Sequence, residues 1–153
     1  MKIRIELDEN LDEQEVIIRT PELTGDIAQL QNIIVEATKG QKSFEFYKGD
    51  VRVYLSLDEI LYFETCDKGI VAHTADDIYE VGYKLYELED LLPRNFMRVS
   101  KSTILNTAKI FSIDRNLTAS SEVAFRNTHK QVYVSRHYYR SLMERLDERR
   151  SNI

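Results

Sequence analysis

The stretch FMRVSKSTILN, residues 96–106, begins like a β-strand and ends like a short polar-then-apolar turn of helix. Bulky and β-branched side chains in its first four residues are typical of a strand. At the junction between the predicted strand and the predicted turn, Arg98 and Lys101 lie among the hydroxyls of Ser100 and Ser102. Cations and hydroxyls are the donors that hold phosphate groups, so this junction is a candidate site for an anion.

The composition predicts a single globular domain, with or without a small appendage. The chain has 153 residues, of which 42% are hydrophobic and 31% charged. It contains no apolar run of the roughly 20 residues that a membrane-spanning helix needs, and we expect a soluble, cytoplasmic protein. Cys66 is the only cysteine and the three histidines are scattered. The sequence therefore predicts no internal disulfide, no structural metal site and no cofactor.

The charge is distributed unevenly along the chain. Its net value is −5, but residues 1–93 contain 9 Lys/Arg against 21 Asp/Glu, and residues 94–153 contain 12 against 5. Such a split is expected when one surface faces an anion and the rest keeps the molecule soluble. An accidental split, or one absorbed by internal salt bridges, explains the counts equally well at this point.

The first 42 residues are predicted to form an appendage of two strands and a helix. Residues 2–8 alternate aliphatic with charged side chains, the period-2 pattern of a half-buried strand, and residues 15–20 form a second candidate strand. Residues 24–40 then place Ile27, Leu30 and Ile34 on one face of an amphipathic helix.

Residues 43–150 are predicted to form a mostly β domain with short helices, α+β in overall class. A hairpin over residues 44–57 and three short strands over 60–82 have the even spacing of a sandwich or roll, not of βαβ units. Leucines at helical spacing predict a helix that ends before Pro93. The remaining predicted elements are strands over 96–99, 109–113, 122–126 and 131–135 and a C-terminal helix over 136–150.

No enzyme signature stands out, and we expect neither catalysis nor a small-molecule substrate. The sequence lacks the nucleophile-elbow, phosphate-loop, dinucleotide, zinc-protease and paired-cysteine motifs. His73, Asp76 and Asp77 are close in sequence but have no nucleophile beside them, so we interpret them as solvated turn residues. Cys66 near Lys68 could be a reactive thiol, but packing or simple exposure in a loop is the more common outcome.

Three cations lie on turns or at element ends, where side chains can leave the surface together. Lys68 lies in the turn CDKG, Lys101 follows the strand that begins at residue 96, and Arg136 begins the last helix. Any one of them alone is most simply an ordinary solvated charge. Their neighbours, however, supply further donors suited to phosphate. These neighbours are Ser100, Ser102, Ser135, Tyr139 and Arg140.

The segments ILYFE, LYELEDLLPRNFMRVSKSTILNTAKI and VYVSRHYYRSLMERL, in this order and spacing, resemble the LytTR DNA-binding domains of bacterial transcription regulators. The resemblance covers roughly residues 43–147. It implies a mostly β fold that docks loops, in place of a recognition helix, into successive major grooves of bent double-stranded DNA.

The resemblance also implies roles for individual residues. Lys101 and Arg136 match base-reading positions, and the third such position falls on Lys68 or Gly69. Ser100 stands where many members have histidine, which puts that imidazole's contact in doubt. The residues implied to hold the DNA backbone are Arg98, Ser100, Ser102, Ser135, Tyr139 and Arg140. Arg98 and Asn106 could instead bond backbone groups within the fold.

We further predict a homodimer on a repeated DNA site, with residues 1–42 as the dimerisation or partner-docking surface; the alternative is a monomer that dimerises only on DNA. Only about 40 residues precede the LytTR-like part, so we expect a stand-alone regulator without a receiver domain. Similar small regulators suggest a membrane-bound inhibitory protein as a further partner. Two rival interpretations remain open from the sequence alone: a protein-interaction module whose basic half binds no nucleic acid, and an RNA-binding β domain.

Overall fold

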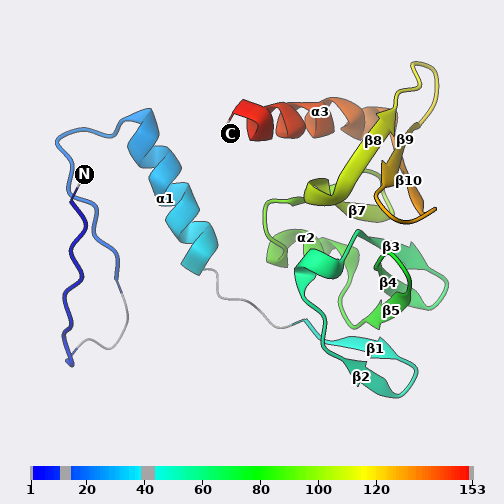
Figure 1. Cartoon of the computed structure of the whole chain (residues 1–153), viewed down its shortest axis with the longest axis horizontal. Coiled ribbons are helices and arrows are strands. Elements are labelled where there is room, and N and C mark those ends of the chain that lie inside the picture. Colours follow the sequence, from blue (N-terminus) through cyan, green and yellow to red (C-terminus); the bar gives the residue numbers. More distant parts are fainter. Residues whose placement is uncertain (1, 11–14, 39–43, 152–153) are drawn as a thin grey trace. The chain divides into compact units, whose positions relative to one another are not determined.

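The computed structural model describes residues 2–10, 15–38 and 44–151, and the chain divides into two compact units, Met1–Thr38 and Lys39–Ile153. The first unit contains helix α1 (Gly25–Thr38), which begins with Asp26 in its first turn (Figure 1). An acidic residue there stabilises the positive end of the helix dipole. The helix predicted from the apolar spacing is thus confirmed. In the described part of the chain, no helix is long and apolar enough to cross a membrane.

The two strands predicted at the N-terminus are wrong. Residues 2–8 and 15–20 have no strand structure, and the side chains of Ile3, Ile5 and Leu7 are 88%, 84% and 95% exposed. A strand needs a neighbour for its backbone N–H and C=O groups. Within the described residues of this unit no second strand supplies them, so the alternating pattern is left without a sheet.

The second unit is built on a seven-stranded antiparallel sheet in the order β2-β1-β5-β4-β3-β7-β6, next to a three-stranded sheet in the order β10-β9-β8. Figure 1 labels the elements. The strands of the larger sheet are β1 (Phe46–Lys48), β2 (Val51–Val53), β3 (Tyr62–Cys66), β4 (Gly69–His73), β5 (Ile78–Val81), β6 (Phe96–Arg98) and β7 (Thr103–Asn106). Those of the smaller sheet are β8 (Ile110–Asp114), β9 (Ser121–Phe125) and β10 (Gln131–Val134).

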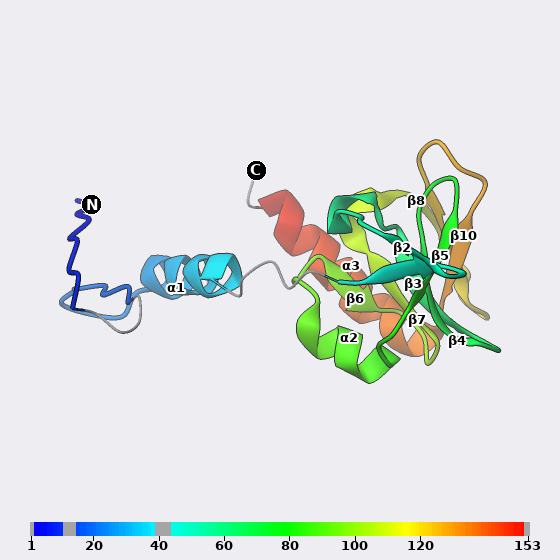
Figure 2. The same ribbon diagram turned by 90° about the horizontal axis from the view of Figure 1, so that it is seen from below.

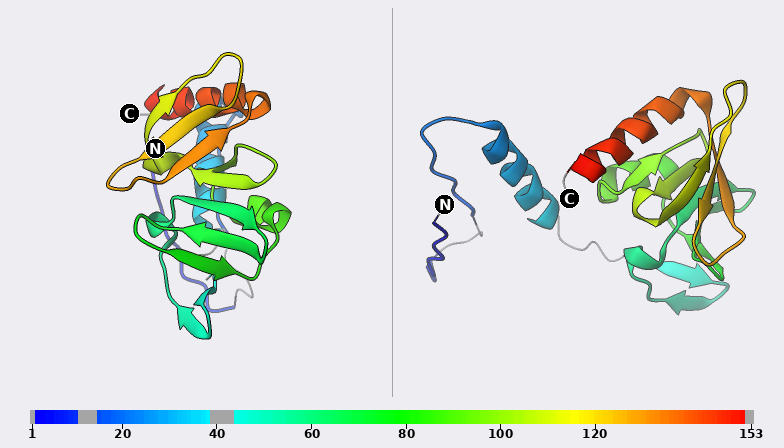
Figure 3. Two further views of the ribbon diagram at one scale, coloured as in Figure 1. Left: turned by 90° about the vertical axis from the view of Figure 1, so that its right-hand side faces the viewer. Right: turned by 45° about the horizontal axis from the view of Figure 1, so that its top comes forward.

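Two α-helices and two short 3₁₀ turns complete this unit. The helices are α2 (Leu85–Leu91) and α3 (Arg136–Ser151), and the 3₁₀ turns are η1 (Leu57–Glu59) and η2 (Thr107–Lys109). The predicted mostly β, α+β class is therefore confirmed. Helix α2 ends before Pro93, as the sequence predicts, and α3 runs alongside the smaller sheet in the views of Figures 1 and 3.

The alternation of side chains along the central strands creates two separate cores. On β3, Phe63 packs into one core and Tyr62 into the other; on β7, Ile104 and Leu105 divide in the same way. Helix α2 covers the first core through Leu85 and Leu88, whereas α3 and the smaller sheet close the second. Figure 2 shows the two helices on different parts of the body. The central strands β3 and β7 are thus buried on both faces, as in a sandwich.

The segment STILN, which the sequence suggests to be a turn of helix, forms strand β7 instead. It pairs with β3 on one side and with β6 on the other, so both edges of its backbone are hydrogen bonded. All four residues of β7 are buried. Burial on both faces removes the polar-apolar alternation by which a strand is recognised, and this explains the error.

Asn106 ties together three segments at the end of β7. Its side chain is fully buried, and its Nδ2 donates to the carbonyl oxygen of Ile60 at 3.0 Å. Its Oδ1 accepts from Nδ2 of Asn95 at 2.9 Å and from the backbone N–H of Ala108 at 3.0 Å. Because both polar atoms of this buried amide have hydrogen-bond partners, the side chain stabilises one arrangement of the three segments. The structural role open to Asn106 from the sequence matches this geometry.

Replacing Asn106 by Ala should lower the free energy of unfolding by about 2–4 kcal/mol, because it leaves buried polar groups without partners. The measurement is urea denaturation followed by circular dichroism. A loss below about 1 kcal/mol would show that these bonds do not hold the segments together.

His73 is buried on β4 and is not the solvated turn residue that the sequence suggests. Only 5% of the residue is exposed; its Nε2 lies 2.7 Å from Oε1 of Glu64, and its ring stacks on Tyr62 at 4.2 Å between centroids. Its Nδ1 is buried without a partner in the described residues. Burial lowers the pKa of His73 against the opposing effect of the Glu64 carboxylate, and nearby Lys130 lowers it further.

The lowered pKa of His73 predicts that folding weakens in mild acid. Below the ordinary histidine pKa of about 6.5 the unfolded chain binds a proton that the folded chain resists, so stability falls as the pH drops from 7 to 5. His73→Phe, which keeps a ring against Tyr62, should flatten this dependence in thermal denaturation. The matched control is His129→Phe, which replaces an exposed histidine; an equal flattening by both variants would contradict the assignment.

Candidate nucleic-acid interface

Backbone hydrogen bonds bring three segments of the second unit side by side. The N–H of Thr65, near the end of β3, donates to the carbonyl of Ser102 at 2.9 Å. The carbonyl of Val99, at the end of β6, accepts from the N–H of Ser135 at 2.9 Å. The turn between β6 and β7 is therefore bonded to the β3–β4 hairpin on one side and to the start of α3 on the other. We call residues 67–69, 99–102 and 135–140 the three-segment face.

The first segment is a two-residue hairpin turn made by Asp67 and Lys68. Cys66 and Gly69 pair across it, and Gly69 has φ of +122°. Only glycine adopts this backbone conformation without strain, so the role of Gly69 is to close a tight turn that leaves Lys68 at its tip. Lys68 is exposed.

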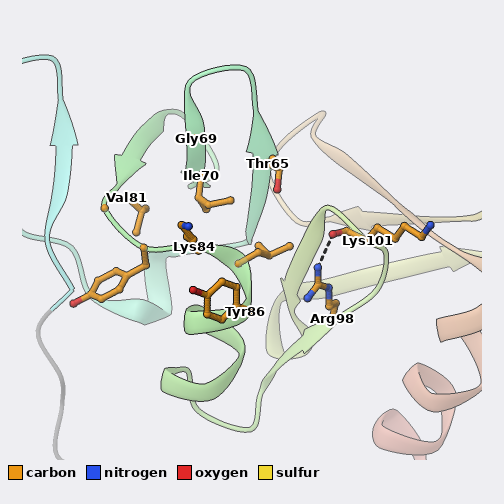
Figure 4. Close-up of a pocket in the computed structure, with 11 residues that line it drawn as sticks. Thr65, Gly69, Ile70, Val81, Lys84, Tyr86, Arg98 and Lys101 are labelled. Atoms are coloured by element: carbon orange, nitrogen blue, oxygen red, sulfur yellow. Dashed lines mark hydrogen bonds between the residues drawn. The ribbon is translucent and has the colours of Figure 1, made fainter.

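The second segment carries Lys101 at an exposed position and is shaped by its own hydroxyls. The Oγ of Ser100 accepts from the N–H of Ser102 at 3.2 Å and lies 3.3 Å from the Oγ of Ser102. Figure 4 shows the side chain of Lys101 extending away from Arg98, and the residue is exposed. The turn therefore has a defined backbone path and presents its cation outward.

The third segment begins α3, whose first residue is Arg136. The N–H groups of Tyr138 and Tyr139 donate to the carbonyl of Ser135 at 3.0 and 3.1 Å, which fixes the first turn of the helix. Leu142, fully buried in the second core, anchors the helix from below. Arg136 and Arg140 are both exposed one turn apart, so they project from a rigid support.

The cations of this face differ in whether they already have a partner within the protein. Among the described residues, Lys68, Lys101 and Arg136 form neither a salt bridge nor a side-chain hydrogen bond. Arg140 pairs with Glu144 at 3.1 Å in an exposed i,i+4 contact, which contributes little and is easily exchanged. The face therefore offers several cations to an external anion.

Arg98 is placed differently, because it lies beneath the second segment and three of its five N–H donors already have acceptors within the protein. Its Nε donates to the carbonyl of Ser100 at 3.1 Å and its Nη2 to the carbonyl of Lys101 at 2.6 Å. Its Nη1 donates to Oε2 of Glu89 at 2.9 Å. Of the two roles left open by the sequence, this geometry supports backbone bonding over contact with phosphate. Nothing in the sequence alone identifies Glu89 as its partner.

An open pocket of about 460 Å³ lies beside the second segment. Figure 4 shows Thr65 and Gly69 of the hairpin, Tyr86 of α2, and Arg98 and Lys101 around it. Arg98 lies at the edge of the pocket and is bonded to the turn. The Lys101 side chain extends away from Arg98. The pocket thus lies between the hairpin and the start of α2, and its lining includes the two exposed cations Lys84 and Lys101.

The residues considered for catalysis do not form one site. His73 is bonded to Glu64, whereas Asp77 forms an ion pair with Lys48 of β1. The Lys48 ammonium lowers the pKa of Asp77, and the Asp77 carboxylate raises that of Lys48, so both groups stay charged. Cys66 is exposed at the end of β3. These groups have separate partners and no shared reaction centre.

Together, these features define a β-rich domain that presents unpaired cations from two turns and a helix start, an arrangement suited to a polyanion. Residues 50–147 match the family described as the LytTr DNA-binding domain. The chain belongs to the LytTR family of DNA-binding domains.

Individual relatives agree with this assignment. Transcriptional regulators described as uncharacterised and HTH-type, from Staphylococcus aureus strains NCTC 8325 / PS 47 and N315, are each 25% identical to this chain over 146 residues. These matches cover 95% of this chain and 98% of each relative. A solved LytTr DNA-binding domain from Bacillus cereus, of a protein described as a methyl-accepting/DNA response regulator, is 25% identical with a TM-score of 0.63. That match covers 69% of this chain and 97% of the solved domain.

Proposed function

We propose that this protein is a sequence-specific transcription regulator that inserts side chains of the three-segment face into successive major grooves of double-stranded DNA. The observation that carries the proposal is the pair of backbone bonds, Thr65 to Ser102 and Ser135 to Val99, that holds three exposed cations on neighbouring segments. The names of the Staphylococcus aureus relatives, which describe transcriptional regulators, support the regulatory role.

The cations at the tips of the three segments are proposed to read bases. Lys101 and Arg136 supply two reading positions, and the hairpin turn at Lys68 and Gly69 supplies the third. A guanidinium can donate two parallel bonds to O6 and N7 of guanine, which distinguishes this base from the others. Cations on neighbouring turns can reach different base pairs of one site because the segments are fixed relative to one another.

The hydroxyls and the remaining cation of the face are proposed to hold phosphates and so set the register of the protein on the duplex. This group excludes Arg98, whose donors already bond carbonyls and a carboxylate. The phosphate-holding residues are Ser100, Ser102, Ser135, Tyr139 and Arg140.

The first unit is proposed to mediate homodimerisation or docking of a regulatory partner, a membrane-bound inhibitor being the partner suggested by resemblance. None of its described residues is buried, and it exposes Ile17, Leu23 and Ile33 besides the aliphatic residues near the N-terminus. A 14-residue helix is only marginally stable in water on its own. Burial of this apolar surface against a second chain would stabilise it.

The proposal as a whole is tested by selecting duplexes from a random pool and then measuring mobility shifts of the selected site against random duplex over a salt series. We expect specific binding at least about 10³-fold tighter than binding to random DNA. Equal affinity for both duplexes would identify a generic polyanion binder. Absence of binding would favour the protein-interaction module.

Arg136→Ala should weaken binding to the selected site by about 1–3 kcal/mol and relax selectivity at one base pair, because one two-bond base contact is lost. Repeating the selection with the variant identifies that base pair. The matched control is Arg126→Ala at the opposite end of the β9–β10 pair, which should leave affinity and selectivity unchanged. Unaltered selectivity in Arg136→Ala would refute its assignment as a base reader.

Arg140→Ala should instead weaken binding to every duplex and reduce the slope of log K against log salt concentration by about one, as expected for one lost phosphate contact. Arg150→Ala, near the other end of the same helix and roughly 15 Å away along its axis, is the control. The assignment fails if both variants change the salt slope equally.

A further inference from the structure

We propose that Arg98, held by Glu89 of α2, is a positioning residue that sets the conformation of the β6–β7 turn for base reading. The proposal rests on the proposed function, because it assigns the turn carrying Lys101 to the DNA. It differs from the role implied by family resemblance, in which Arg98 would hold a phosphate.

The donors of Arg98 are divided between the β6–β7 turn and helix α2. Two of its nitrogens donate to consecutive carbonyl groups of the turn, those of Ser100 and Lys101, at 3.1 and 2.6 Å. A third donates to Glu89 at 2.9 Å, and only 22% of the Arg98 side chain is exposed. The dashed contact in Figure 4 runs from Arg98 to the Lys101 backbone, opposite the outward-pointing Lys101 side chain.

These bonds fix which way the turn faces. Because the carbonyls of Ser100 and Lys101 point inward to the guanidinium, the turn cannot rotate its peptides without breaking two charge-assisted hydrogen bonds. The Lys101 side chain is thereby kept on the outer side. Glu89 extends the support to the protein core, since its helix is anchored by the buried neighbour Leu88.

The arrangement requires an arginine. A guanidinium has five N–H donors in a rigid planar fork and can bond two carbonyls and one carboxylate at once. A lysine at position 98 would keep the charge but present a single nitrogen on a flexible chain. A phosphate contact through Arg98, by contrast, would be limited to the two N–H donors that these bonds leave, on a side chain that is 22% exposed and already paired with the negatively charged Glu89.

The test compares Arg98→Lys, Arg98→Ala, Glu89→Gln and the control Asp90→Asn in the full chain, using the duplex selected by the unaltered protein and a random duplex. Asp90 is exposed on the same helix, and its replacement removes the same charge without touching the turn. We expect Arg98→Lys to weaken binding to the selected duplex about tenfold and Glu89→Gln about threefold, with random-duplex affinity and salt slope unchanged. Asp90→Asn should not weaken specific binding.

The outcomes separate positioning from its alternatives. If Glu89 acted only as a negative charge near DNA, both acidic variants would tighten binding to all duplexes, and this result would overturn the proposal. If Arg98→Ala lost the same affinity for both duplexes and had a smaller salt slope, Arg98 would be a phosphate contact, and this result would also overturn the proposal. Thermal denaturation of each variant shows whether it folds. If Arg98→Lys unfolds, Glu89→Gln still tests the proposal, because the Glu89 side chain is half-exposed and its replacement leaves the core intact. Failure of the unaltered protein to prefer its selected duplex would refute the proposed function itself.

Discussion

The arrangement of the site depends on how the Val99 peptide is held. Its N–H donates to the carbonyl of Thr103 at 3.0 Å, and its carbonyl accepts from Ser135 at 2.9 Å. Its side chain is fully buried in the second core, so the residue cannot move without disturbing the packing there. The β6–β7 turn, the start of α3 and, through the Thr65–Ser102 bond, the β3–β4 hairpin all take their positions from this point. A face made of turns can be specific only if its segments are fixed in this way.

Charge counting finds an excess of cations in residues 94–153, but several of these cations already have partners within the protein. In residues 94–153, Arg94 pairs with Glu148 at 2.7 Å, Arg145 donates to the carbonyl of Arg94, and Arg149 donates to that of Thr107. Burial lowers the pKa of Arg145, with the neighbouring Arg94 as a second cause. Internal partners, one of the interpretations of the charge split, thus account for these three cations.

The sequence predicts the strands of the second unit well because alternating side chains mark half-buried strands, and it predicts the class and family because the motifs span most of that unit. The prediction from sequence fails where a segment distant in sequence determines the local structure. Residues 2–8 alternate like a strand but have no described partner strand, whereas STILN lacks the alternation because β7 is covered on both faces. The pairing of Arg98 with Glu89 could not be predicted either, since it depends on where α2 lies relative to the turn.

The central claim is that the three-segment face acts as one surface on DNA. Amide chemical shifts recorded during titration with the selected duplex test it most directly. We expect the amides of residues 67–69, 99–102 and 135–140 to shift together along a single binding curve, while those of the β1–β2 hairpin stay in place. Shifts confined to one segment, or concentrated on that hairpin, would contradict it.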